Sequence, residues 1–300
     1  MSAAVVTVCE VSPRDGLQND PATLTTGQKI SLIHRAAAAG ARRIEAVSFA
    51  HPARVPAMAD AEAVMAGLDR TRGVAYSGLV LNERGLDRAQ AAGVDEVNVV
   101  VVATDTFARR NQNMTTAESL DVAERVVRAA TAAGLPTTVT LAAAFGCPFE
   151  GEVSRSRFDE CVGRIGALGP TEIALADTIG VAVPRQVRDR IELTRSQVPE
   201  LPVRVHLHDT RNTGIANALA AVEAGVSTLD ASVGGVGGCP FAPAATGNVA
   251  TEDLAWVLHR SGIATGLDVE LLRRTAAWLA DALGHDVPGA LLRAGVFPST

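Results

Sequence analysis

Residues 93–102 have the sequence GVDEVNVVVV and follow a stretch with helical character that contains several alanines. A glycine directly after a helix adopts the left-handed conformation that lets the chain turn back. The run from Glu96 to Val102 is β-branched and nearly continuous, which is typical of a strand in a parallel sheet that is covered on both faces. This stretch therefore predicts a junction between a helix and a buried parallel strand.

The same junction recurs along the chain, with glycines at positions 40, 134, 169 and 225. The expected strands are residues 5–10, 43–47, 74–81, 96–102, 137–141, 172–176, 203–208 and 228–232, with helical patterns between them such as 27–39 and 118–133. Eight such units predict a (β/α)8 TIM barrel. The alternative is a doubly wound sheet, which is disfavoured because no Gly-x-Gly-x-x-Gly motif follows the first strand. We expect one domain over 1–300, with 268–300 as a C-terminal helical extension packed on the barrel.

Composition excludes several classes of protein. The 300 residues are 47% hydrophobic and 20% charged, which is too apolar for a disordered chain. A net charge of -6 with no basic run disfavours both nucleic acid and anionic membrane surfaces as partners. No apolar segment approaches the roughly 20 residues of a spanning helix, and residues 1–4 (MSAA) lack a charged stretch followed by an apolar core, so we expect a cytoplasmic protein. The four cysteines contain no Cys-x-x-Cys pair and are expected to be reduced thiols.

Polar side chains gather where the expected strands end. His206 and His208 are two residues apart on one strand, so both imidazoles point to the same side. Asp15, after the first strand, and Asn248, after the last, add two oxygen donors. Two nitrogens and two oxygens favour an octahedral Mg²⁺ or Mn²⁺ over a tetrahedral zinc. The alternative is a structural or surface histidine pair without a metal.

Arg14 also lies after the first strand, where a guanidinium can donate paired hydrogen bonds to a carboxylate or to a developing enolate oxygen. Its alternative role is an ion pair with Glu45 on the neighbouring strand, and both roles are compatible. Asp177, at the end of the sixth strand, is placed in the same way, with helix capping as the alternative.

A glycine-rich segment, residues 234–248, follows the eighth strand. It suits either a lid or a phosphate-binding loop. Cys239 lies within it, where a thiol can move in to exchange a proton or be incidental to the chemistry.

Six motifs resemble the hydroxymethylglutaryl-CoA lyase family over nearly the whole chain. They are residues 10–19 (EVSPRDGLQN), 44–49 (IEAVSF), 145–151 (FGCPFEG), 177–180 (DTIG), 206–210 (HLHDT) and the loop from Gly237-Gly238-Cys239-Pro240 to Asn248. This family belongs to the metal-dependent barrel enzymes that also include isopropylmalate and homocitrate synthases. The Gly-Gly-Cys-Pro loop is the element most specific to the lyases.

The resemblance implies a site and a reaction. It implies a divalent metal held by Asp15, His206, His208 and Asn248, catalytic roles for Arg14, Glu45, Asp177, His206 and Cys239, and substrate contacts from Arg14, Gln18, Ser48 and Thr140. The expected reaction cleaves 3-hydroxy-3-methylglutaryl-CoA to acetyl-CoA and acetoacetate, with either His206 or Asp15 as the base. The expected partner is this acyl-CoA, and the expected assembly is a homodimer.

The chain departs from the family at positions that bear on the substrate. A tyrosine usual after the fifth strand is Thr140 here, and a small polar pair is Ala142 and Ala143, which predicts a roomier and less polar acyl pocket. Pro21 and the segment 284–286 replace basic residues that we expect to contact the CoA phosphates. The alternatives are therefore a lyase of citramalyl-CoA, isohexenylglutaryl-CoA or a carrier-bound thioester, a condensing synthase, or a barrel that binds without catalysis.

Overall fold

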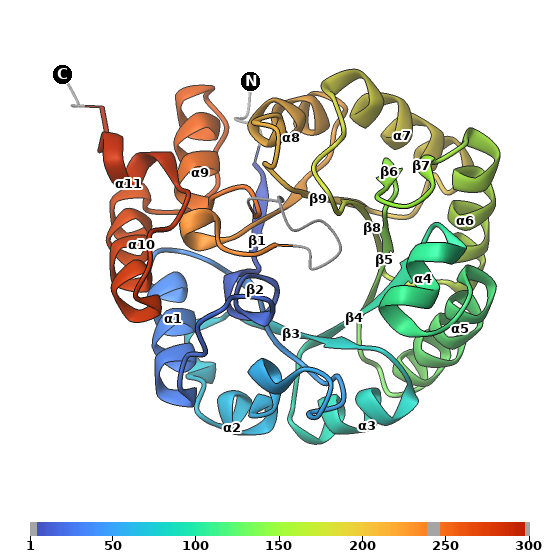
Figure 1. The fold of residues 1–300 in the computed structure, drawn as a ribbon, viewed down its shortest axis with the longest axis horizontal. Helices are drawn as coiled ribbons and strands as arrows, with labels where there is room; N and C mark the ends of the chain where they lie inside the picture. Colours follow the sequence, from blue (N-terminus) through green and yellow to red (C-terminus); the bar gives the residue numbers. More distant parts are fainter. Residues whose placement is uncertain (1–4, 239–246, 298–300) are drawn as a thin grey trace.

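A computed structural model describes residues 5–238 and 247–297 and forms a closed barrel of eight parallel strands (Figure 1). The order around the barrel is β1-β10-β9-β8-β5-β4-β3-β2. The strands are β1 (Thr7–Glu10), β2 (Arg43–Ser48), β3 (Ala75–Val80), β4 (Glu96–Val102), β5 (Thr137–Ala142), β8 (Glu172–Asp177), β9 (Val203–Leu207) and β10 (Thr228–Ala231). The predicted TIM barrel is confirmed, and the doubly wound sheet is excluded because β1 pairs with both β2 and β10.

Helices surround the barrel and cover the outer face of its sheet (Figure 1). They are α1 (Thr26–Ala38), α2 (Ala61–Ala66), α3 (Glu83–Ala91), α4 (Asp105–Gln112), α5 (Thr116–Ala132), α6 (Arg155–Leu168), α7 (Pro184–Gln197), α8 (Gly214–Glu223) and α9 (Thr251–Arg260). Short turns η1 (Ser12–Gly16), η2 (Pro56–Met58), η3 (Arg70–Arg72) and η4 (Val233–Gly235), and a hairpin of β6 (Gly146–Cys147) and β7 (Gly151–Glu152), complete the loops.

The glycines that the sequence placed at helix ends have the expected backbone conformation. Their φ angles are positive in all five cases, from 70° at Gly134 and Gly169 to 102° at Gly40. An L side chain rarely adopts such angles, so glycine at these positions directs the chain from each helix into the next strand.

Element boundaries differ slightly from the predicted ones. The first strand begins at Thr7, two residues late, because Val5 makes only an isolated bridge to Ala264 outside the barrel. The strand expected to reach His208 ends at Leu207, since His208 pairs with Asn248 instead of with a barrel strand. This pairing ties the histidine strand to the end of the glycine-rich segment.

The C-terminal part contains α10 (Val269–Leu283) and α11 (Ala290–Ala294), and α10 lies beside α1 in Figure 1. Asp268 N donates to Ala39 O at the C-terminus of α1, and Leu272, Ala276 and Leu279 belong to the main hydrophobic core. The division into one domain with an extension from 268 stays a prediction.

The sequence predicts reduced cysteines and no membrane-spanning helix, and both expectations can be compared with the described part of the chain. Cys9, Cys147 and Cys161 are free and buried there. Among the same residues, no helix has both the length and the hydropathy to cross a membrane.

Candidate active site

A pocket of about 220 Å³ opens at the carboxyl ends of the barrel strands. Its lining includes seven of the predicted site residues, which are Arg14, Asp15, Gln18, Ser48, Thr140, His206 and His208. They come from η1 and the residues just after it, from β2 and β5, and from the end of β9 with the residue that follows it. In parallel barrels this end of the strands is where active sites are found.

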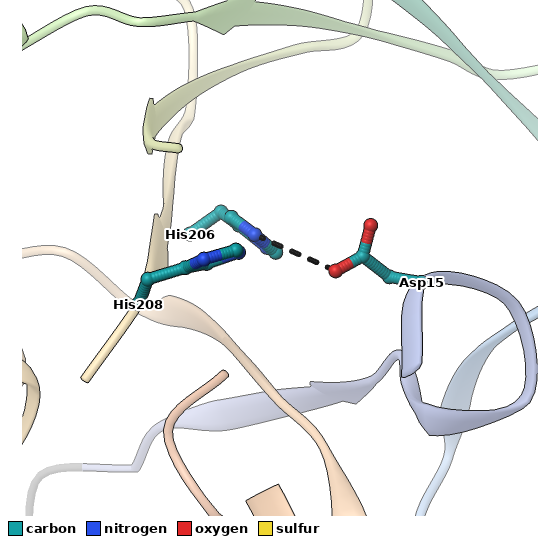
Figure 2. A group of neighbouring side chains, drawn as sticks. All are labelled: Asp15, His206 and His208. Atoms are coloured by element: carbon teal, nitrogen blue, oxygen red, sulfur yellow. Dashed lines mark ion pairs between the residues drawn. The ribbon is translucent and has the colours of Figure 1, made fainter. Parts of the chain in front are cut away.

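Asp15, His206 and His208 form a group that could hold a metal ion (Figure 2). One potential ligand atom from each lies within 4.8 Å of the others. His206 Nε2 is 3.9 Å from Asp15 Oδ2. Both imidazoles point in the same direction, towards Asp15 on η1 (Figure 2). The separation is too long for a direct hydrogen bond and leaves space between the donors.

Asn248, the fourth predicted ligand, lies beside Asp15. Its Nδ2 donates to Asp15 Oδ2 at 2.9 Å and to the carbonyl of Val236 at 3.1 Å. Its Oδ1 is buried without a hydrogen-bond partner, and so is His208 Nδ1. Buried acceptors without a partner are costly unless something else satisfies them. Carboxylate, amide oxygen and imidazole donors fit a divalent cation, so the residues present are compatible with the predicted metal.

Asp230, on β10, was not predicted to belong to the site. Its Oδ2 lies 3.0 Å from His206 Nδ1, and Asp230 also lines the pocket. A carboxylate in this position holds the proton on Nδ1 and leaves Nε2 free to bind an ion. Burial disfavours the charged imidazolium of His206, but the bond to Asp230 and the charge of Asp15 outweigh it and raise its pKa.

The environments of Asp15 and His208 favour the protonation states that bind metal, whereas the raised pKa of His206 makes a proton compete with the ion there. Burial opposes ionisation of Asp15, but the Arg14 guanidinium and then His206 outweigh it and hold the pKa of Asp15 well below its usual range. Burial, followed by the nearby His206, lowers the pKa of His208 to about 4. At neutral pH, Asp15 is therefore a carboxylate and His208 a neutral imidazole, which are the forms that bind metal.

Arg14 lies against two carboxylates at once. Its Nε donates to Glu45 Oε1 at 2.6 Å and its Nη1 to Asp15 Oδ1 at 2.7 Å. The ion pair with Glu45 that the sequence left as an alternative is thus present. Neither bond uses Nη2, and Arg14 lines the pocket, so the remaining N–H groups are oriented by these two anchors.

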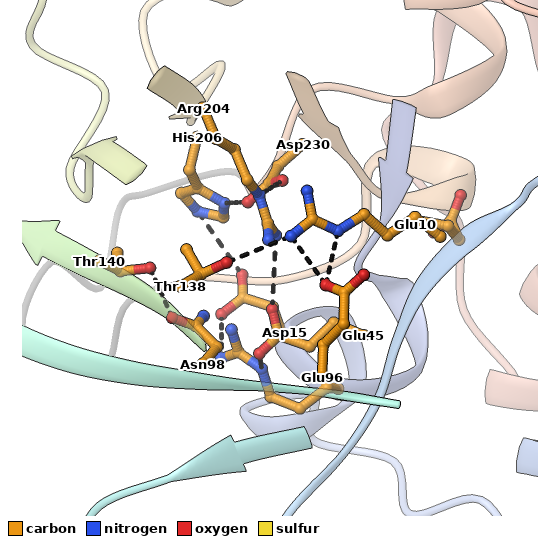
Figure 3. A network of polar contacts seen from close by, with 12 residues as sticks. Glu10, Asp15, Glu45, Glu96, Asn98, Thr138, Thr140, Arg204, His206 and Asp230 are labelled. Atoms are coloured by element: carbon orange, nitrogen blue, oxygen red, sulfur yellow. Dashed lines mark hydrogen bonds and ion pairs between the residues drawn. The ribbon is translucent and has the colours of Figure 1, made fainter. Parts of the chain in front are cut away.

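Beneath the site, the barrel is filled by a buried polar network (Figure 3). Arg204 Nε donates to Asp230 Oδ1, and the Arg204 guanidinium lies 3.7 Å from Glu45 and 3.9 Å from Glu172. Sequence reasoning missed Arg204 and Asp230. The period-two pattern contained the information for Arg204, because it lies two residues before His206 on the same strand and so on the same face.

Asp177 is placed differently from the other predicted residues. It is buried but does not line the pocket, and its carboxylate accepts the backbone N–H groups of Val181 at 2.9 Å and Ala182 at 3.0 Å. These bonds hold the loop between β8 and α7 in place. This role is similar to helix capping, which was the alternative for Asp177. Its catalytic role stays a prediction.

The ends of the glycine-rich segment lie beside the metal group. A Cβ on Gly237 would come within 2.4 Å of Asn248 Nδ2, so only glycine permits this approach. Asn19 Nδ2 donates to Gly238 O at 3.2 Å, and Gly238 lines the pocket. Cys239 itself lies outside the described residues, so its role as an acid stays a prediction.

Two of the predicted substrate residues have internal partners. Thr140 lies within β5 rather than after it, and its hydroxyl donates to Asn98 Oδ1 at 2.8 Å. Ser48 Oγ accepts the backbone N–H of Ala50 at 3.2 Å. Asn98 also lines the pocket and was not predicted.

The chain is similar in sequence and in structure to known proteins. Residues 5–279 match the HMGL-like family model. The chain is 40% identical to a hydroxymethylglutaryl-CoA lyase of Bacillus subtilis over 98% of both chains, and 42% identical to an (R)-citramalyl-CoA lyase of Chloroflexus aurantiacus over 98% of this chain and 96% of that one. A solved structure of an HMG-CoA lyase from Acinetobacter baumannii, in complex with coenzyme A and 3-methylmalate, superposes with a TM-score of 0.93 at 40% identity, over 99% of this chain and 98% of that one.

The family match covers most of the chain, and the relatives align over almost their whole length, so the resemblance of the six motifs extends to the complete barrel. The chain therefore belongs to the HMGL-like family of lyases.

Proposed function

We propose that the protein is a metal-dependent carbon–carbon lyase that cleaves 3-hydroxy-3-methylglutaryl-CoA to acetyl-CoA and acetoacetate. The observation that supports it most directly is the position of Arg14, which contacts the potential metal ligand Asp15 and lines the same pocket. A guanidinium fixed beside a cation site suits a reaction in which negative charge develops on a carbonyl oxygen.

Asp15, His206, His208 and Asn248 would hold the cation, which is proposed to be Mg²⁺ or Mn²⁺. When bound, such an ion acts as a Lewis acid that polarises substrate oxygens and lowers the pKa of a hydroxyl. By holding the ion, the two histidines and Asp15 would also orient that hydroxyl. Either His206 or Asp15 takes its proton, and both alternatives stay open. His206 can do so only while its Nε2 is not bound to the ion, because its Nδ1 carries the proton shared with Asp230.

The reaction then breaks the bond between C2 and C3 of the acyl chain. The hydroxyl oxygen at C3 becomes the ketone oxygen, and the electron pair of the broken bond moves onto the thioester as an enolate. Arg14, held by Glu45, donates to the enolate oxygen. A proton from Cys239 to C2 completes acetyl-CoA, so the base gains one proton and the acid loses one.

A second candidate is cleavage of citramalyl-CoA or another 3-hydroxyacyl thioester by the same chemistry. The similarity to a citramalyl-CoA lyase supports it, and so does the replacement of the family's tyrosine by Thr140. A synthase that runs the condensation uses the same groups in reverse. A homodimer, supported by the sequence resemblance, and the cytoplasmic location expected from the sequence are also part of the proposal.

The test uses protein that has been stripped of metal and reconstituted with Mg²⁺ or Mn²⁺. It is incubated with 3-hydroxy-3-methylglutaryl-CoA, citramalyl-CoA and related thioesters, and acetyl-CoA is measured by mass. We expect acetyl-CoA to form with metal and not with chelator. Cleavage of none of them would contradict a CoA lyase, and loss of added acetyl-CoA together with a keto acid would identify a synthase.

A further inference from the structure

The pocket has two unlike walls. One wall contains Arg14 and the potential metal ligands Asp15, His206 and His208. The wall built by β3, β4, β5 and α4 contains an apolar patch, which consists of Leu79, Leu81, Val100, Val102, Phe107 and Ala142. The same elements also add Asn98, Asn111, Gln112 and Thr140 to the pocket lining beside this patch. The proposed function accounts for the first wall, and it assigns the apolar patch no role beyond contact with one methyl group.

The apolar wall arises from a change in residue type along two strands. On β4 the positions two apart are Glu96, Asn98, Val100 and Val102, so this face of the strand changes from polar to apolar towards the mouth of the barrel. On β5, Thr140 is followed at the next inward position by Ala142. The change from polar to apolar residues occurs at nearly the same level of the barrel on both strands, because Val100 pairs with Thr140 and Val102 with Ala142.

This wall is preformed. Val102, Phe107 and Ala142 are buried and belong to one hydrophobic cluster with Cys147 and Ile179. The Phe107 ring meets Phe149 edge-on with centroids 5.8 Å apart, which supports the wall from α4.

Two of the polar side chains beside the apolar patch already make hydrogen bonds within the protein. The Thr140 hydroxyl donates to Asn98, and Gln112 Nε2 donates to the carbonyl of Val100 at 3.0 Å. These bonds occupy the Thr140 hydroxyl, Asn98 Oδ1 and one N–H group of Gln112. An apolar group of the ligand can lie along Val100, Val102 and Phe107 without breaking either bond.

We propose that this wall is a subsite for an apolar branch on C3 of the substrate, longer than methyl. The preferred substrate class is then a 3-hydroxy-3-alkylglutaryl thioester whose branch reaches Val102 and Phe107, while its hydroxyl, carboxylate and thioester oxygen face the metal group and Arg14. The inference rests on the proposed function. The competing occupant of the wall is the pantetheine arm of CoA.

A homologous substrate series tests this. 3-Hydroxy-3-alkylglutaryl-CoA thioesters with methyl, ethyl, propyl and butyl branches are compared by kcat/KM with the metal-reconstituted enzyme. We expect kcat/KM to rise from methyl to propyl by up to about fourfold per methylene, the factor for burying one CH₂ group. A flat or falling series with normal cleavage of the methyl compound would overturn the inference and leave the proposed function standing. No cleavage of any member would overturn the function itself.

Paired variants locate the subsite. Ala142→Val narrows the apolar wall, and we expect it to lower kcat/KM for the propyl compound at least tenfold more than for the methyl compound. Ala176→Val is the matched control, because Ala176 lines the pocket beside His206 on the metal side, and it should affect all chain lengths alike. If Ala142→Val instead lowers kcat/KM equally for every branch, with a rise in KM, the wall holds pantetheine and the inference is wrong. Mn²⁺ binding by each variant shows that it has folded.

Discussion

His206 Nδ1 and Asp230 Oδ2 lie 3.0 Å apart on neighbouring strands at the floor of the pocket. Burial opposes charge on Asp230, but Arg204 and then His206 outweigh it and lower its pKa, so it stays ionised. The aspartate therefore sets which nitrogen of His206 faces the metal group. This dependence makes Asp230 a positioning residue, although it is not one of the predicted ligands.

Asp230→Asn should weaken metal binding by roughly 10- to 100-fold, the usual effect of losing a carboxylate that orients a histidine ligand. The measurement is a titration with Mn²⁺ followed by electron paramagnetic resonance or calorimetry. Glu223→Gln is the control, because Glu223 is exposed and pairs with Arg188 far from the pocket. Equal Mn²⁺ affinity in Asp230→Asn and the parent would show that Asp230 does not orient His206.

Arg14→Met should give a folded protein that still binds metal but turns over at least about a hundredfold more slowly, because it lacks the donor for the developing oxyanion. Arg14→Lys keeps the charge but not the paired donors, so it should recover only part of the rate. Turnover under saturating substrate and Mn²⁺ affinity are measured together. Near-normal turnover in Arg14→Met would contradict the role of this side chain.

The sequence predicted the barrel because the same local pattern recurs along the chain: a glycine ends a helix, and an apolar strand follows it. It also predicted that Asp15, His206 and His208 lie together, because the two histidines share one side of a strand and Asp15 follows a strand end. Local pattern is sufficient for such features.

Asp230 and Arg204 were harder to predict for a physical reason. Their roles depend on which strands become neighbours and on how the strands are staggered, and no pattern within a single strand states this. Asp177 shows the same difficulty, since its placement after a strand is identical to that of Asp15, but its carboxylate turns to backbone N–H groups of the next loop. Strand ends identify candidates, and the barrel geometry selects among them.

Arg204→Met should strongly destabilise the fold. The Arg204 side chain is 1% exposed and lies among Asp230, Glu45 and Glu172. Removing it leaves buried carboxylates without their counter-charge, which costs about 3–5 kcal/mol. The control is Arg188→Met, whose exposed pair with Glu223 contributes at most about 1 kcal/mol.

Equilibrium unfolding in urea compares the two arginine variants. If Arg204→Met is too unstable to purify, Arg204→Lys provides an intermediate case with a smaller expected loss. Equal unfolding midpoints for Arg204→Met and Arg188→Met would show that the buried network does not depend on this guanidinium.

Glu252 makes stability depend on pH. Full burial raises its pKa to about 8, although its Oε2 accepts the backbone N–H of Gly234 at 3.0 Å. Between the unfolded pKa of about 4.3 and this value, the native state keeps a proton that the unfolded chain has released. The contribution of Glu252 is therefore fully present at low pH and is lost as the pH rises through about 8, by up to about 1.4 kcal/mol per pH unit.

Glu252→Gln should remove this contribution, because a neutral amide can still accept from Gly234 and has no proton to lose. The free energy of unfolding is measured in urea from pH 6 to 9 for both proteins. Burial also raises the pKa of the nearby Glu10, so the parent and the variant share that second dependence and their difference isolates Glu252. We expect the variant to gain stability relative to the parent as the pH rises. A constant difference across this range would show that Glu252 is ionised throughout it.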